Sequence, residues 1–183
     1  NFKSNFGVRY KIRCYNRNDN LEINEDLVFH FAGIAHDLKN KINVNEYYKV
    51  NTELTKKIFD CFLKSDAIFF LYLSTVKAVS DDFGETLFES QQPNPKTHYG
   101  KSKLLAEKYI LSKKIPKNKR VFILRPCMVH GPGNKGNLNL LYSLIVKGFP
   151  WPLGSYENKR SYCTLYNLFF VIDQLINDKK ISS

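Results

Sequence analysis

The sequence predicts an α/β fold, in which helices cover both faces of a doubly wound and mostly parallel, Rossmann-like sheet. Two observations predict this fold. Short apolar runs typical of buried strands recur along the chain, and the longer segments between them repeat apolar residues every three or four positions. The alternation ends near residue 126. We therefore expect a core over residues 1–126 and a smaller, partial region over residues 127–183 packed on it.

The first predicted elements lie before residue 65. Residues 8–14 alternate apolar and polar side chains, which predicts a strand followed by a polar loop. A second strand is predicted at Leu27–Phe31, where Ala32 and Gly33 end the strand with side chains too small to obstruct a ligand. An amphipathic helix follows, with apolar residues at helical spacing at Tyr47, Val50, Leu54, Ile58, Cys61 and Phe62.

The next strand is the apolar run Asp66–Leu73, which ends in Ser74 and Thr75. Ligands of open parallel sheets bind at the carboxyl ends of the strands, so these hydroxyls are predicted to lie at a binding edge. Residues 81–98 are polar, and we expect them to form a loop over this edge. The remaining predicted elements are a helix over 99–113, a strand over 120–124, a Gly/Pro loop over 126–136, a helix over 138–146, a turn over 148–154 and a helix over 165–176.

The composition is that of one globular unit of 183 residues, 43% hydrophobic and 14% aromatic. The formal net charge of +11 is spread along the chain without a long basic run, which disfavours a nucleic-acid-binding module. Four cysteines without Cys-x-x-Cys spacing disfavour a metal centre or a disulfide framework. No run approaches the ~18 apolar residues of a membrane span, and no signal peptide is evident. We expect a cytoplasmic protein with neither nucleic acid nor membrane as a partner.

A Tyr-x-x-x-Lys pair opens the helix that follows the predicted loop. Tyr99 and Lys103 lie on one helical face with Cβ atoms roughly 5–6 Å apart. A phenol needs roughly 4 kcal/mol of extra stabilisation of its phenolate to lower its pKa from ~10 to about 7, and a nearby ammonium favours that charge. The spacing alone is not specific, since Tyr109 and Lys113 repeat it. Tyr99 follows a strand end that carries hydroxyls, whereas Tyr109 is predicted to be a packing residue in mid-helix.

These motifs resemble the extended short-chain dehydrogenase/reductase family, and most closely its bacterial NAD-dependent epimerase/dehydratase enzymes of surface polysaccharides. The matching segments follow in family order: Val28-Phe-His-Phe-Ala-Gly33, Val50-Asn51-Thr52, Leu73-Ser-Thr75, Tyr99-x-x-x-Lys103, Leu124-Arg-Pro126 through Gly131-Pro-Gly133, and Arg160-Ser-Tyr162.

Two family elements are missing from the sequence: the N-terminal strand with its Gly-rich turn, and the C-terminal end. Gly131–Gly136 has the Gly-x-Gly-x-x-Gly spacing, but Pro132 removes an N–H from it, so we disfavour it as a pyrophosphate loop.

The resemblance implies site residues and a cofactor. Tyr99 is expected to be the catalytic base, Thr75 to hydrogen-bond the reacting oxygen, and Lys103 to lower the pKa of Tyr99 and hold the nicotinamide ribose. The implied cofactor is NAD, with NADP as the alternative, and no metal is implied. The implied cofactor contacts are Phe31, Ala32, Gly33, Asn51, Ser74, Tyr99, Lys103 and Pro126. The implied substrate contacts are Thr75, Met128, Asn137 and Arg160.

The activity implied by the resemblance is redox chemistry at a carbon of a nucleotide sugar, with a UDP-sugar as the expected partner. A 4-epimerase and a 4-ketoreductase use the same residues, so the sequence leaves both open. Val76 and Lys77 stand where dehydratases carry Asp-Glu, which disfavours a 4,6-dehydratase. Met128, Ser161 and Thr164 depart from the family, which leaves the sugar open. The alternative is a non-catalytic dinucleotide-binding protein or a truncated, inactive homologue. Residues 45–64 and 99–113 are the expected helices of a homodimer.

Overall fold

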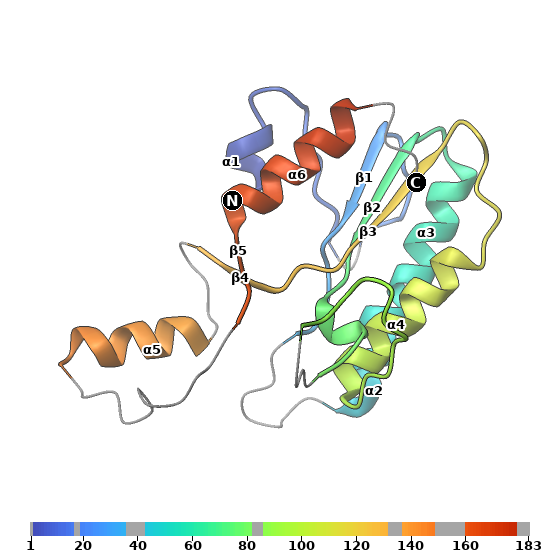
Figure 1. Ribbon diagram of the computed structural model, residues 1–183. Coiled ribbons are helices and arrows are strands. Elements are labelled where there is room, and N and C mark those ends of the chain that lie inside the picture. Colours follow the sequence, from blue (N-terminus) through green and yellow to red (C-terminus); the bar gives the residue numbers. More distant parts are fainter. Residues whose placement is uncertain are drawn as a thin grey trace.

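A parallel three-stranded sheet forms the centre of the protein, seen in a computed structural model that describes residues 2–16, 19–35, 43–81, 86–131, 137–148 and 160–178 (Figure 1). Its strands lie in the order β1 (Leu27–His30), β2 (Phe69–Leu73) and β3 (Arg120–Leu124). The register places Leu73 beside Leu124 and Tyr72 beside His30. The three strands therefore end at one edge, where the predicted hydroxyls follow β2.

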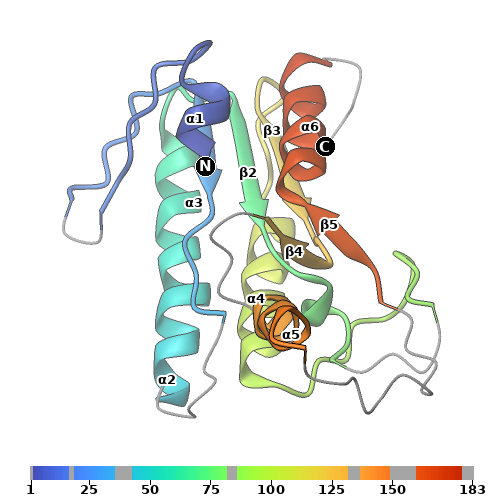
Figure 2. The ribbon, with the colours of Figure 1, turned by 90° about the vertical axis from the view of Figure 1, so that its left-hand side faces the viewer.

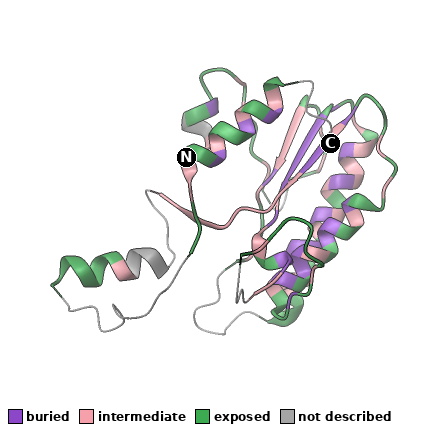
Figure 3. Cartoon of the chain, viewed as in Figure 1, coloured by how far each residue is buried: buried purple, intermediate pink, exposed green. Residues whose placement is uncertain are grey.

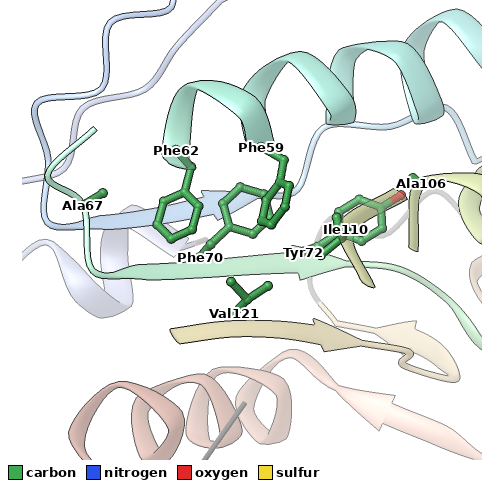
Figure 4. Packing of buried hydrophobic residues seen from close by; sticks show 8 residues of the cluster. All are labelled: Phe59, Phe62, Ala67, Phe70, Tyr72, Ala106, Ile110 and Val121. Atoms are coloured by element: carbon green, nitrogen blue, oxygen red, sulfur yellow. The ribbon is translucent and has the colours of Figure 1, made fainter. Parts of the chain in front are cut away.

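One face of the sheet is covered by two long helical segments. The first runs without a break through α2 (Val44–Tyr47), η1 (Tyr48–Glu53) and α3 (Leu54–Lys64), and the second is α4 (His98–Leu111) (Figure 2). Aromatic side chains of α3 point at β2, where Phe59 and Phe62 meet Phe70 at ring-centroid distances of 5.0 and 5.1 Å (Figure 4). The cluster on this face consists of Phe59, Phe62, Ala67, Phe70, Tyr72, Ala106, Ile110 and Val121.

The opposite face is covered by α1 (Phe2–Phe6) and α6 (Leu165–Asn177). A second cluster lies there, made of Phe6, Phe69, Leu71, Phe122, Leu168, Ile172 and Leu175. Burial is concentrated on β2 and on the inner sides of the helices, because the central strand is covered on both faces (Figure 3). The predicted doubly wound α/β fold is therefore confirmed.

Two adjacent basic residues at the start of β3 hold the C-terminal ends of helices on opposite faces. The Lys119 ammonium is buried and donates to the carbonyl oxygens of Phe62, Ser65 and Ala67, at 3.2, 2.6 and 2.6 Å. The Arg120 guanidinium donates to three carbonyl oxygens at the end of α6, each at 3.0 Å. Carbonyls at a helix C-terminus lack intrahelical partners and carry partial negative charge, so both cations stabilise helix ends.

Two parts of the chain differ from the prediction. Residues 8–14 form a turn and irregular chain and not a strand, and Tyr10 and Ile12 pack against the cluster beneath α1 and α6. A second, two-stranded parallel sheet was not predicted; it pairs β4 (Met128–His130) with β5 (Tyr162–Thr164). The turn predicted over 148–154 lies outside the described residues after Gly148.

Two short elements complete the described chain: η2 (Val76–Ala78), which follows β2, and α5 (Asn137–Val146), which stands apart from the sheet in Figure 1. None of the helices in the described ranges is long and apolar enough to cross a membrane.

Candidate functional site

A π-helical turn, η1, carries Asn51 to the end of β1. Its side chain is fully buried and all its polar atoms are used: Oδ1 accepts from the Ile34 N–H at 2.8 Å, and Nδ2 donates to the Ile34 carbonyl at 3.1 Å and to Ser102 Oγ at 3.0 Å. A π turn inside an α-helix frequently marks a functional site. Asn51 therefore ties the chain that leaves β1 to α4.

Lys103 lies at the same edge and is almost completely buried. Its ammonium donates to the carbonyl oxygen of Leu73 at 2.9 Å and lies 4.7 Å from the centre of the Tyr72 ring. Burial lowers the pKa of Lys103 to about 8, although the nearby Glu107 carboxylate acts in the opposite direction. The ammonium is thus held at the carboxyl end of β2, as the sequence predicted.

Gly33 leaves the space in which these two side chains meet. A Cβ atom at Gly33 would lie 3.1 Å from both Asn51 Oδ1 and Lys103 Nζ, which is tighter than an ordinary contact. The glycine is therefore required for the close approach of the chain after β1 to Asn51 and Lys103. Ala32, beside it, is exposed. The structure brings together three of the predicted cofactor contacts here: Gly33, Asn51 and Lys103.

Thr75 and Tyr99 form the second part of the site. Thr75 follows β2 in extended conformation and caps η2, where its hydroxyl accepts from the Lys77 N–H at 3.3 Å. Burial raises the pKa of the Tyr99 phenol, and a hydrogen bond with the Thr75 side chain acts against that rise. The expectation that Lys103 lowers the pKa of Tyr99 stays a prediction, and the net direction in this structure is a rise. The pKa is raised because the desolvation of a phenolate outweighs the Thr75 hydrogen bond.

Gly100 determines how closely Thr75 approaches α4. A Cβ atom at Gly100 would collide with the carbonyl oxygen of Lys77 and would lie 2.8 Å from Pro95 Cβ. Only glycine lets the backbone of η2 pack against the first turn of α4, directly beside Tyr99. Gly100 was not among the predicted site residues, although a glycine directly after the tyrosine is a visible signal in the sequence.

Asp81 fixes the start of α4. Its carboxylate accepts from the Lys96 N–H at 2.6 Å and from Thr97 N–H and Oγ1 at 2.8 and 2.6 Å. Partial burial alone would raise the pKa of Asp81, but these hydrogen bonds hold it below its ordinary value. Thr97 in turn caps the helix, because its hydroxyl accepts from the Gly100 N–H at 3.1 Å. The segment predicted as a loop is therefore anchored where it enters the Tyr99 helix.

A buried ion pair lies behind Lys103 and was not predicted. Glu107 is fully buried, and Arg125 donates to it from Nε at 3.0 Å and from Nη2 at 2.6 Å. Glu107 follows Lys103 by one helical turn, as Lys103 follows Tyr99. One face of α4 thus carries a phenol, an ammonium and a carboxylate in succession.

Two buried hydroxyls of β2 and its end have no hydrogen-bond partner among the described residues, Tyr72 Oη and Ser74 Oγ. A buried, unpartnered polar atom costs free energy, which a bound ligand or water can recover. Ser74 was predicted to contact the cofactor, and its backbone N–H donates to the Leu124 carbonyl at 2.7 Å. The Ser74 hydroxyl is therefore a group at this edge that a bound ligand could engage.

The other predicted contacts lie away from α4. Phe31 packs its ring against Phe2 and Phe29 at 5.1 and 5.9 Å, on the face of α1 and α6. The carbonyl of Pro126 accepts from the Val76 N–H at 3.2 Å and so joins the end of β3 to η2. Three predicted substrate contacts belong to the region after residue 126: Met128 begins β4, the exposed Arg160 precedes β5, and Asn137 begins α5, with its side chain outside the described residues.

The second Tyr-x-x-x-Lys pair has a different role. Tyr109 donates to the Asp60 carboxylate at 2.8 Å, and the Lys113 ammonium lies 4.4 Å from the Tyr109 ring centre and 3.7 Å from Asp60. Tyr109 also packs against the cluster on this face. The pair thus ties α4 to α3, which confirms Tyr109 as a packing residue.

Comparison with known proteins gives consistent matches at the level of sequence. A sequence model of the NAD dependent epimerase/dehydratase family matches residues 16–168. A UDP-glucose 4-epimerase of Vibrio cholerae is 30% identical over 185 residues, covering 97% of this chain and 56% of that protein. An N-acetyl-alpha-D-glucosaminyl-diphospho-ditrans,octacis-undecaprenol 4-epimerase of Escherichia coli O157:H7 is 29% identical over 124 residues, covering 67% and 37%. The chain spans about half the length of the first of these relatives and less of the second.

Solved structures match the fold. MoeE5 in complex with UDP-glucuronic acid and NAD superposes with a TM-score of 0.76 at 20% identity, covering 94% of this chain and 60% of that one. A UDP-glucuronic acid 4-epimerase of Bacillus cereus, in complex with UDP-glucuronic acid and NAD, gives 0.68 at 21% identity, covering 84% and 50%. At this identity the superpositions establish the shared Rossmann-type architecture.

Proposed function

The chain belongs to the NAD-dependent epimerase/dehydratase family, and from this premise we propose that it serves NAD-dependent redox chemistry on a nucleotide sugar. The observation that carries the proposal is the edge where Gly33, Lys103, Thr75 and Tyr99 meet. A phenol, a hydroxyl and an ammonium at the carboxyl end of a parallel sheet are groups that move a proton and bind an anionic cofactor. The proposed reactions are 4-epimerisation and 4-keto reduction of a UDP-sugar.

The residues at the edge fit the nicotinamide end of NAD. The Lys103 ammonium holds the ribose, Gly33 lets the chain after β1 approach Asn51 and Lys103 closely, and the unpartnered Ser74 hydroxyl offers the cofactor a hydrogen bond. NAD, when bound, supplies the hydride acceptor and donor for a sugar carbon. We assign the role of cofactor-binding core to residues 1–126, and a substrate-binding role to residues 127–183 with Met128, Asn137 and Arg160.

Tyr99 and Thr75 act on the sugar. Tyr99, as phenolate, removes the proton of a sugar hydroxyl, and Thr75 hydrogen-bonds the same oxygen and stabilises its developing charge. Burial alone works against the phenolate, so the Thr75 hydrogen bond and the positive charge of Lys103 have to favour it. The pair therefore needs Lys103 in its charged form.

The proposed substrate class follows from the relatives. Their names specify a UDP-glucose 4-epimerase and a 4-epimerase of a diphospho-undecaprenol sugar, and solved neighbours hold UDP-sugars with NAD. A diphosphate-linked sugar is common to these names, and it would suit the positively charged chain. A role in surface polysaccharide synthesis, a cytoplasmic location and a homodimer through residues 45–64 and 99–113 remain predictions.

The test compares two equivalent tyrosine variants of the 183-residue chain. Binding of NAD and of UDP-glucose is measured by calorimetry, and interconversion of the UDP-sugar epimers is measured by chromatography. We expect Tyr99→Phe to bind NAD but to lose turnover by at least about 100-fold, because the general base is gone. Tyr109→Phe makes the same change in the second Tyr-x-x-x-Lys pair of the same helix and should retain turnover.

The outcomes separate the candidate functions. Turnover that survives Tyr99→Phe, or falls equally in both variants, contradicts the proposed base. A second candidate is a non-catalytic dinucleotide-binding protein, which is favoured by the burial that raises the pKa of the Tyr99 phenol. NAD binding without turnover in the unmodified chain would support that candidate. Absence of binding to both ligands would overturn both.

A further inference from the structure

Among the described groups that act on Lys103, one carries a negative charge. The titratable groups facing Lys103 are Tyr99 and Glu107 on its own helix, Tyr72 on β2 and His30 on β1. Burial raises the pKa of both phenols and lowers the pKa of His30 to about 3, so these three groups are neutral at pH 7. Glu107 is therefore the group that favours the charged ammonium.

The Glu107 side chain is held in one orientation. Its carboxylate is fully buried, and the Arg125 guanidinium binds it through two nitrogens from the end of β3. A buried ion pair is weakly stabilising at best, since an apolar pair of the same size often gives equal stability. The pair does, however, orient its two charges. The Glu107 carboxylate lies one helical turn from Lys103, and the Arg125 guanidinium carries the positive charge.

We propose that Glu107, held by Arg125, is a positioning residue that keeps the Lys103 ammonium charged at the carboxyl edge of the sheet. The proposal rests on the proposed function for its purpose, because the chemistry at Tyr99 uses that charge. The placement itself rests on geometry. Lys103 is buried against the Tyr72 ring, where an ammonium is desolvated, and the nearest compensation on its own helix is Glu107.

The pair predicts opposite effects for its two members. Glu107→Gln removes the attraction and leaves Arg125 unpaired behind Lys103, so the pKa of Lys103 should fall by about one unit. Arg125→Met leaves the carboxylate without its guanidinium, so the pKa of Lys103 should rise. The double variant removes both charges and keeps a neutral pair of similar size. We expect it to lower the pKa of Lys103 by less than Glu107→Gln does.

The measurement is a pH titration of the full 183-residue chain labelled with ¹³C-lysine, followed by NMR. The Lys103 resonance is assigned from the spectrum of Lys103→Arg. Lys113 lies two residues after the end of α4 and faces Asp60, so it serves as the internal control and should not respond to these variants.

If the pair had a purely structural role, the pKa of Lys103 would shift in the same direction in both single variants, or it would stay unchanged while the free energy of unfolding fell. Either result overturns the proposal. If a single variant does not fold, the double variant decides: a wild-type pKa for Lys103 in that chain is incompatible with the proposal. The titration needs neither cofactor nor turnover, so a chain that proves inactive still tests the role of Glu107.

Discussion

Because His30 is buried, we predict a marked loss of the free energy of unfolding of this chain in mild acid. Its ring lies beneath the site, stacked on Tyr72 at a centroid distance of 5.5 Å, and Nε2 is 2.8 Å from Thr55 Oγ1. The Thr55 hydroxyl donates its single hydrogen to the Asn51 carbonyl at 2.7 Å, so Nε2 of His30 has to be the donor to Thr55. The ring is thereby held as one neutral tautomer, away from water.

The magnitude follows from the pKa of that ring. Burial, and then the charge of Lys103, lower the pKa of His30 from its ordinary 6.5 to about 3. Below pH 6.5 the unfolded chain therefore binds a proton that the folded chain does not bind until about pH 3. The free energy of unfolding therefore decreases as the pH is lowered from 6.5 to about 3. Linkage gives a limit of about 1.4 kcal/mol per pH unit, or about 2 kcal/mol lost between pH 7 and pH 5.

The assay is urea unfolding at pH 7, 6 and 5, with His30→Gln as the test variant and His98→Gln as the matched control. Glutamine cannot titrate but can still donate to Thr55. We expect His30→Gln to be less stable at pH 7 but to lose almost nothing further at pH 5. His98 is exposed, so its variant should keep the wild-type acid slope.

The reasoning fails if His30→Gln keeps the full acid slope of the unmodified chain. The loss would then come from other groups, and the burial of the imidazole would not be its cause. Carboxylates contribute little in this window, because their ordinary pKa values lie near 4.

Two further predictions concern backbone fit and a buried cation. Gly100→Ala should cost about 1–3 kcal/mol in urea unfolding, because the new Cβ displaces the Lys77 carbonyl, and it should also weaken the Thr75–Tyr99 contact; unchanged stability would contradict the tight packing. Lys119→Met should cost about 2 kcal/mol, because the carbonyl oxygens of Ser65 and Ala67 lose the ammonium that donates to them, while that of Phe62 keeps its Ser65 donors. Lys117→Met, at an exposed position, should be neutral, and equal costs would refute the capping role.

The central elements could be predicted because their sequences carry one dominant signal. β3 was expected at Arg120–Leu124 and has those bounds, and the apolar run to Leu73 contains β2. A strand covered on both faces must be continuously apolar, so burial and periodicity agree. The helix at Tyr99 was likewise placed within one residue of its start and two of its end.

The secondary-structure predictions were wrong where an alternating sequence pattern had a cause other than strand pairing, and where a strand was too short to give a pattern. Residues 8–14 alternate because Tyr10 and Ile12 pack on the cluster beneath α1 and α6, and no strand is paired with them. β4 and β5 have three residues each, too few for an alternation to be recognised. Their pairing joins segments more than thirty positions apart in the sequence, and local signals do not report such a contact.

Within the site, motifs identified Thr75, Tyr99 and Lys103 but not the groups that govern their charge. Glu107 lies at ordinary helical spacing, and its partner Arg125 is 18 residues away, so neither is distinguished in the sequence. The raised pKa of Tyr99 could not be predicted either, because it depends on how deeply the ring is buried. Desolvation is a property of packing, which a motif does not contain.

The adjacent cations at the start of β3 have a consequence for how the molecule opens. Lys119 holds the end of α3 on one face and Arg120 the end of α6 on the other, so consecutive residues join both layers. When the first residues of β3 detach, both helix ends lose their donors together. In amide hydrogen exchange, the last turns of α3 and α6 should therefore behave as one cooperative unit, although their ends, Lys64 and Asn177, are far apart in the sequence.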